Sequence, residues 1–154
     1  MKQHYAFVVM VREKYWLAYR DRNDEGKKAH AYVVRGAAPP KNVKVLLFYV
    51  SKPVKSLCGY ANFIGREVGD SAMLWNKHCD ESVLRSWVEY EEFVGTAGSV
   101  SFIRFNDLRE AVDPIPLRNL LSFFGVKKLS RKGFYVDKDV TGQLILMMEE
   151  GGKA

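Results

Sequence analysis

The chain has 154 residues, of which 47% are hydrophobic and 27% are charged, close to the composition of an average globular domain. A chain of this length can bury a sufficient core without a disulfide framework or a structural metal. The composition excludes a disordered chain, and two cysteines are too few for a disulfide-stapled scaffold. We therefore expect one domain over residues 1–154.

Basic residues outnumber acidic ones, with 24 Lys and Arg against 18 Asp and Glu, a net charge of +6 and a pI near 9.3. Such a surface attracts phosphate groups whatever the fold, so a nucleic-acid or nucleotide partner is favoured. The apolar run Ala6–Val11 is too short to span a bilayer and no signal-peptide cleavage site follows it. We expect a cytoplasmic protein, favour a monomer, and expect Cys58 and Cys79 to be reduced thiols.

The first third of the chain contains two expected strands. Tyr5–Val11 is a continuous β-branched and aromatic run, which indicates a buried strand. Tyr15–Tyr19 fits either a strand or a helix, and the charged segment Arg20–Lys28, with its turn formers, indicates a loop. Ala31–Val34 is a short strand candidate that ends before Gly36.

The middle of the chain alternates strong strand signals with a helical section. Val43–Ser51 gives the strongest strand pattern of the sequence, and Gly59–Val68 a second, whose glycines predict bends or bulges. Asp70 or Ser71 can cap a short helix that runs through Trp75–His78.

Four further elements are expected after this helix. Ser82 can cap a helix that ends at Gly95, and Ser99–Phe105 alternates as a strand does. Leu117–Phe124 indicates a short helix, and Thr141–Met148 the last strand. The whole pattern predicts an α+β domain of about five or six strands with two or three short peripheral helices, and a sheet of this kind can close into a small β-barrel.

The order of motifs between Val43 and Met148 resembles the ASCH and EVE-related branches of the PUA-like superfamily. An apolar strand ends at Pro53, and a glycine-led strand of the type G-x-A-x-F begins at Gly59. A helix with Tyr and Phe follows, and then a further strand and a P-I-P-L turn at residues 114–117. The pattern is most similar to an uncharacterised archaeal branch of that superfamily.

The resemblance implies a β-barrel that holds RNA or a modified base in a cleft beside it. Some ASCH members are hydrolases of acylated cytidine or nucleases, with the hallmark G-x-K-x-x-E-x-R. Here Gly26 and Lys28 fit that hallmark, but Ala31 stands in place of the glutamate and Val33 in place of the arginine. Without the carboxylate there is no general base at this position, so we expect binding rather than catalysis, and no cofactor.

Two basic clusters are the candidate nucleic-acid-binding sites. Cations neutralise phosphates and aromatic faces stack exposed bases, so segments that combine the two favour nucleic acid. Two lysines that follow the strongest strand complete the set, because ligand groups often stand at strand ends. The candidates are Arg12, Lys14, Tyr15, Trp16, Arg20, Lys28, Lys52, Lys55, Lys127, Lys128, Arg131 and Lys132, with Tyr19 and Tyr60 as further stacking candidates.

Two other functions stay open at this stage. The chain could be a hydrolase or nuclease of nucleic-acid components, with Lys28 and His30 as the first residues to test. It could also be a non-catalytic partner-binding domain whose charge serves solubility alone. The adjacent His78 and Cys79, with Cys58 elsewhere, lack the spacing of a metal site, so no metal is expected.

Overall fold

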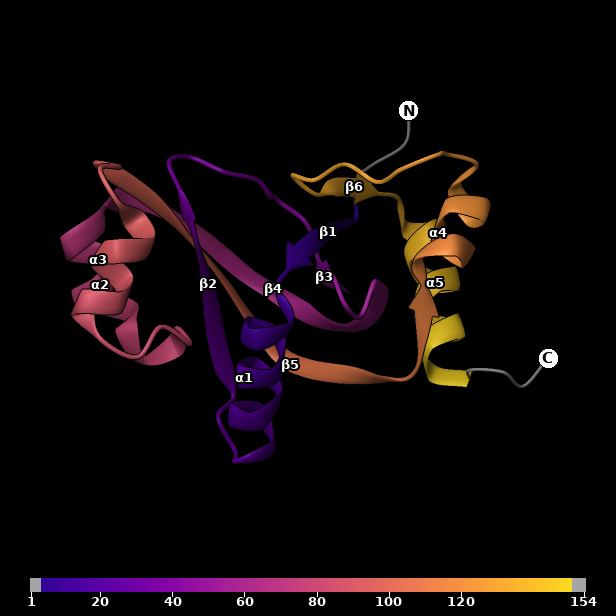
Figure 1. The fold of residues 1–154 in the computed structure, drawn as a ribbon, viewed down its shortest axis with the longest axis horizontal. Coiled ribbons are helices and arrows are strands. Elements are labelled where there is room, and N and C mark those ends of the chain that lie inside the picture. The colour runs from indigo at the N-terminus through magenta and orange to yellow at the C-terminus, as the bar shows by residue number, and fades with distance from the viewer. Residues whose placement is uncertain (1–3, 151–154) are drawn as a thin grey trace.

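The computed structural model describes residues 4–150, which form six strands and five α-helices with one short 3₁₀ turn (Figure 1). The strands are β1 (Ala6–Val11), β2 (Ala29–Arg35), β3 (Val45–Val50), β4 (Ser56–Asp70), β5 (Ser99–Pro116) and β6 (Phe134–Val136). The helices are α1 (Glu13–Asp24), α2 (Ser71–His78), α3 (Trp87–Val94), α4 (Leu117–Phe124) and α5 (Lys138–Glu150), and the 3₁₀ turn is η1 (Cys79–Glu81). In residues 4–150 no helix combines the length and the apolar character needed to cross a membrane.

The six strands form one open sheet in the order β2-β5-β4-β3-β1-β6. β1 and β3 are parallel, and every other neighbouring pair is antiparallel. The α+β class is confirmed, but the prediction of a closed barrel is wrong. β6 occupies the outer edge of β1 at Ala6–Val8, and β2 pairs with β5 alone among the strands, so β1 and β2 do not join.

The two longest strands, β4 and β5, are much longer than their sequence patterns predict. β4 continues to Asp70 and β5 to Pro116, and they pair over most of their lengths. Register shifts in β4 lie next to Gly59 and Gly65, as the glycines of this segment predict. The pattern missed the second half of β5 because Asn106 and Asp107 resemble turn residues, and Asp107 does adopt a positive φ of 52° within the strand.

Helices account for most of the other differences. The ambiguous segment Tyr15–Tyr19 belongs to α1, which continues into the segment expected to be a loop. Asp70 caps α2 by accepting a hydrogen bond from the Met73 amide at 3.0 Å, as predicted. The cap of α3 is Ser86, not Ser82; the Ser82 hydroxyl accepts instead from the amide of Leu84.

The segment predicted as the last strand is a helix. Thr141, Leu144 and Met148 are its buried residues, and their spacing of three and four places them on one face of α5. Asp137 begins this helix by accepting a hydrogen bond from the Val140 amide at 2.8 Å. The expected count of two or three helices was therefore too low, and the last strand is the short β6.

Successive residues of β1 point to two different cores. Ala6 and Val8 belong to the core that α4 and α5 cover, whereas Phe7, Val9 and Val11 belong to the core beside α1. A third cluster joins α2 and α3 to the far ends of β2 and β5. In Figure 1 the α2–α3 pair and the α4–α5 pair lie at opposite ends of the long β4–β5 ribbon, with α1 between them.

Candidate nucleic-acid interface

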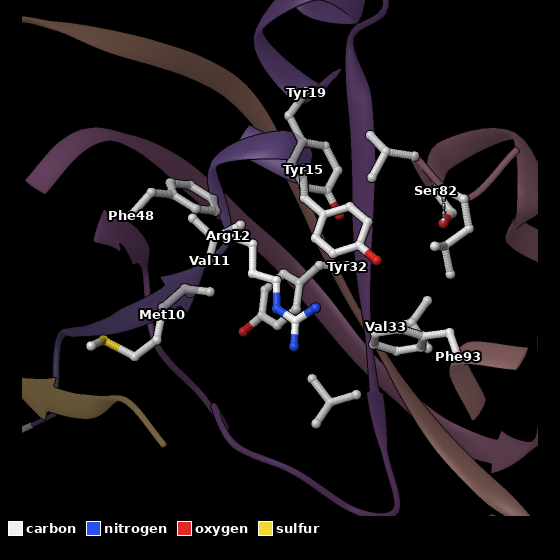
Figure 2. Close-up of a pocket in the computed structure, with 14 residues that line it drawn as sticks. Met10, Val11, Arg12, Tyr15, Tyr19, Tyr32, Val33, Phe48, Ser82 and Phe93 are labelled. Atoms are coloured by element: carbon white, nitrogen blue, oxygen red, sulfur yellow. Dashed lines mark hydrogen bonds between the residues drawn. The ribbon is translucent and has the colours of Figure 1, made fainter. Parts of the chain in front are cut away.

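A cleft opens between β1 and β2, the strands that would have to meet to close the barrel. We call it the tyrosine cleft; it has a volume of about 210 Å³. The end of β1, the first turns of α1, β2, β3, the segment before α3 and α3 itself all contribute to its wall (Figure 2). Its lining residues are Val9, Met10, Val11, Arg12, Tyr15, Tyr19, Tyr32, Val33, Val34, Phe48, Ser82, Val83, Leu84 and Phe93.

Aromatic rings make up much of this wall. Tyr15 packs edge-on against Phe93 with ring centroids 6.4 Å apart. Tyr19 is buried, and its hydroxyl donates a hydrogen bond to the Ala31 carbonyl at 2.8 Å. Burial raises the pKa of both Tyr19 and Tyr32 above the ordinary value, so both remain neutral phenols at physiological pH.

Arg12 supplies the only charge in the wall of the tyrosine cleft, whose lining lies wholly within residues 4–150. It stands between β1 and α1, where its carbonyl accepts hydrogen bonds from the amides of Tyr15 and Trp16. Its side chain makes no capping bond, and Figure 2 shows the guanidinium pointing into the cleft alongside Tyr15 and Tyr32. The backbone therefore fixes the position of the Arg12 Cα, and no carboxylate of residues 4–150 pairs with its guanidinium.

A second hollow, of about 510 Å³, adjoins the tyrosine cleft. We call it the loop hollow, because the segment before β6 forms one of its walls. It shares Val9, Met10, Tyr32 and Val34 with the tyrosine cleft. Its charged lining residues are Arg35, Arg131 and Lys132, and it has no carboxylate in its described lining. The two adjoining hollows thus carry four cations and no acid.

The loop hollow places Arg131 and Lys132, from the loop after α4, beside the hollow that Arg12 lines. Arg131 and Lys132 precede Gly133, which has a φ of +84° and lies so close to Phe7 that an added Cβ would be 2.7 Å from its ring. Arg35 is held on the other side by a hydrogen bond from its Nε to the Phe93 carbonyl at 3.0 Å. Segments about 120 residues apart, around Arg12 and Arg131, therefore meet at one site.

Two other candidates of the N-terminal segment have different surroundings. Lys14 is exposed, and its ammonium group lies 4.9 Å from the ring centroid of Tyr15. Trp16 is only 4% exposed and packs against Phe48 with ring centroids 5.6 Å apart. The ring of Trp16 is thus part of the core behind the cleft.

The remaining predicted residues lie away from the tyrosine cleft and the loop hollow. Arg20 pairs with Asp21 and Glu110 at 3.3 and 3.6 Å. Lys28 lines a separate hollow with Asn62 and Asn106. The others are exposed and stand in the β3–β4 turn or in the loop after α4: Lys52, Lys55, Lys127 and Lys128. The further stacking candidate Tyr60 hydrogen bonds to Glu149.

Of the four positions compared with the hydrolase hallmark, only Val33 lines the tyrosine cleft, and Gly26, Lys28 and Ala31 do not. Ala31, which stands where the glutamate would be, is fully buried. His30 is also buried: its ring stacks on Phe105 at 5.4 Å and its Nε2 is 3.3 Å from the Asn23 amide oxygen. Burial, with Lys27 and Arg22 nearby, lowers the pKa of His30 to about 4. His30 is therefore a neutral core residue at physiological pH.

Several lining residues could not be identified from sequence. Val83, Leu84 and Phe93 reach the cleft only because the α2–α3 segment folds back beside β2, and Ala31 forms an isolated bridge to Ser82 there. Arg35 and Tyr32 belong to the basic, aromatic N-terminal segment. The alternation of β2 was the one available signal for Tyr32, since it places Tyr32 and Val34 on the same face.

The comparison with solved structures finds the same fold in an ASCH protein from Zymomonas mobilis. A serine-to-alanine variant of that protein matches with a TM-score of 0.80 at 19% identity, covering 97% of this chain and 100% of the other. The ASCH protein itself matches at 0.75 and 18% (96% and 98% covered), and a tyrosine-to-phenylalanine variant at 0.73 and 17% (94% and 99% covered). No family model matches the sequence, and neither does any curated protein.

These matches show that this chain has the fold of the Zymomonas mobilis ASCH protein. The resemblance derived from the motifs between Val43 and Met148 is confirmed at that level. The proposed kinship with an archaeal branch stays a prediction. Nearly the whole of both chains is aligned. The match therefore includes the open sheet and the five helices, with the α2–α3 pair among them.

Proposed function

We propose that this protein binds RNA or a modified nucleotide in the tyrosine cleft and the adjoining loop hollow. One observation carries the proposal: two basic segments distant in sequence lie at two adjoining, aromatic-lined hollows that have no carboxylate in their described lining. Chance placement of surface charge would mix both signs, since the chain has 18 acidic residues.

The chemistry of the lining suits a nucleotide. The cations Arg12, Arg131 and Lys132 would neutralise phosphates, and none of them pairs with a carboxylate of residues 4–150. Tyr15 and Tyr32 would stack a base, an interaction worth about 1–3 kcal/mol for each base. Their hydroxyls would donate to or accept from a base edge.

Binding is proposed rather than catalysis because the tyrosine cleft offers no general base. Its described lining contains no Asp, Glu, His, Cys or Lys. The nearest titratable groups are phenols, and the raised pKa of Tyr19 and of Tyr32 keeps them protonated. The guanidinium of Arg12 has only N–H donors, so it can bind an anion but cannot accept a proton from a substrate.

Fluorescence anisotropy with a labelled single-stranded RNA tests this function. We expect a dissociation constant of about 1 μM at low salt, and a logarithmic salt slope of about −3 if four cations each neutralise one phosphate. The double substitution Arg131→Glu and Lys132→Glu should weaken binding at least about tenfold and reduce the slope by about 1.5. Binding that is absent, or that does not depend on salt, would contradict the proposal.

A matched control separates a local effect from a general loss of charge. Arg118 is exposed on α4 and lines neither the tyrosine cleft nor the loop hollow. Arg118→Glu changes the net charge as Arg12→Glu does. We expect Arg12→Glu to weaken RNA binding about tenfold and Arg118→Glu to leave it within about twofold. Equal effects of the two substitutions would mean that the cleft is not the binding site.

A further inference from the structure

Another hollow adjoins residues 82–84, which form part of the wall of the tyrosine cleft. We call it the Trp75 hollow; its volume is about 700 Å³. The end of α1 and the α2–η1 segment form its walls, and Leu84 lines both this hollow and the tyrosine cleft. Its lining residues are Arg22, Glu25, Gly26, Lys27, Trp75, Cys79, Asp80, Leu84 and Arg85.

Trp75 gives this hollow a rigid aromatic surface. Its ring stacks on Tyr90, with centroids 4.5 Å apart and an angle of 27° between the planes. Trp87 contacts it edge-on at 6.4 Å. Tyr90 is fully buried and its hydroxyl donates to the Ser71 carbonyl at 2.7 Å, so the ring beneath Trp75 is fixed. A ring that is held in place loses little entropy when a second ring stacks on it.

Three cations line the Trp75 hollow, and they differ in their contacts. Arg22 donates a hydrogen bond to the Ser82 carbonyl, which anchors it to the segment that also lines the tyrosine cleft. Lys27 pairs with Asp80 at 3.3 Å. Arg85 is exposed and forms no ion pair within residues 4–150. Two carboxylates, Glu25 and Asp80, oppose these three cations, so the hollow keeps a positive excess.

A smaller hollow, of about 250 Å³, lies between the tyrosine cleft and the Trp75 hollow. It is lined by Lys14, Tyr15, Ala18, Val83, Arg85 and Glu89. It shares Tyr15 and Val83 with the tyrosine cleft, and Arg85 with the Trp75 hollow. A path with a cation at each step therefore runs from the loop hollow through the tyrosine cleft to Trp75.

We propose that the Trp75 hollow is a second base-binding subsite, so that the ligand is a single-stranded oligonucleotide that spans both sites rather than a free nucleotide. One base would occupy the tyrosine cleft and another would stack at Trp75, with the connecting phosphates beside Lys14 and Arg85. This inference rests on the proposed function of the tyrosine cleft. It adds a site that neither the sequence analysis nor the comparisons assign, and it selects polymer over monomer.

The test compares a nucleoside monophosphate with a ten-nucleotide single-stranded RNA. Arg85→Glu should weaken binding of the ten-mer about tenfold and lower its logarithmic salt slope by about one, because one phosphate contact is lost. The same substitution should leave affinity for the monophosphate unchanged. Arg12→Glu should weaken binding of both ligands, and Arg118→Glu of neither by more than about twofold.

A spectroscopic readout locates the second base. Binding of the ten-mer should quench tryptophan fluorescence in the wild-type protein, because a base stacks on Trp75. Because the exposed Trp87 contacts Trp75 and would also report a nearby base, the comparison is made in a Trp87→Phe background. There Trp75→Phe retains a ring against Tyr90 and should abolish most of the quenching, whereas the buried Trp16 should contribute little to it. Thermal unfolding followed by circular dichroism confirms that each variant is folded.

The outcomes separate the two proposals. If Arg85→Glu binds the ten-mer as tightly as the wild type, or no more weakly than Arg118→Glu does, the second subsite is wrong while the tyrosine cleft can still stand. Quenching that persists in Trp75→Phe in the Trp87→Phe background also overturns the subsite. If Arg12→Glu affects neither ligand, the proposed function itself fails, whatever Arg85→Glu shows.

Discussion

The two sides of the sheet at β1 are covered in different ways. On one side, Ala6 and Val8 face α4 and α5, and the core there includes Leu144 and Met148, both fully buried. On the other side, Phe7, Val9 and Val11 belong to the core beside α1, and Val9 and Val11 also line the tyrosine cleft. Alternate residues of one strand thus contribute to a sealed core and to the proposed binding site. Stability and binding should therefore be separable by mutation on the two sides.

The largest effect is expected on the sealed side. Leu144→Ala removes a fully buried side chain from the core under α5 and should lower the free energy of unfolding by about 3 kcal/mol. Urea denaturation measures this loss. RNA affinity of the folded variant should match that of the wild type, and a clear loss of affinity would mean that the two sides are coupled.

The cleft side should lose stability at acid pH through His30. Its pKa is about 4 in the folded protein against an ordinary 6.5, so the unfolded chain binds more protons in between. Stability is complete above pH 6.5 and is lost as the pH falls towards 4, by at most about 3 kcal/mol. Denaturation at several pH values should show this dependence in the wild type, and a weaker dependence in His30→Gln. Identical profiles would exclude His30 as the cause.

Tyr15 tests the open side without disturbing the sealed one. Tyr15→Leu keeps an apolar side chain against Phe93 but removes the stacking surface, so RNA affinity should fall about tenfold. The free energy of unfolding should change by less than about 1 kcal/mol, because Tyr15 is only half-buried. If stability falls and affinity does not, Tyr15 belongs to the core and not to the site.

The smallest effect is expected from Lys127 and Lys128. Both are exposed and line neither the tyrosine cleft nor the loop hollow. They should act at long range, so the double substitution to alanine should lower RNA affinity by about twofold, mainly through a slower association rate. Stopped-flow association at two salt concentrations measures this. A tenfold loss would extend the contact surface to these residues.

The sequence predicted elements well where the pattern was local. Strand β3, helix α4 and the Asp70 cap of α2 were all correctly predicted, because each depends on a few neighbouring residues. Failures came from tertiary contacts. Thr141–Met148 reads equally well as a strand or as a buried helix face, and only its packing against β4 and β5 decides. Closure of the sheet likewise depends on what occupies the edge of β1.

The candidate site was only partly predictable for the same reason. Arg12, Tyr15, Arg131 and Lys132 were identified from charge and aromatic content, and the structure brings them to adjoining hollows. Trp16 is also aromatic and directly follows Tyr15 in the sequence. Consecutive residues of a helix point in different directions, however, and Trp16 points into the core. No sequence pattern indicates that residues 82–84 would form a wall shared by two hollows.

Gly133 has a consequence for how recognition could change in this fold. The chain passes so close to Val8 and Phe7 at this point that no side chain fits, and β6 begins immediately afterwards. The loop that carries Arg131 and Lys132 is therefore anchored at its downstream end and exposed before it. Insertions or exchanges upstream of Gly133 would present new side chains to the same hollow and leave the sheet intact. Gly133 thus fixes one end of a loop whose upstream residues can change without disturbing the sheet.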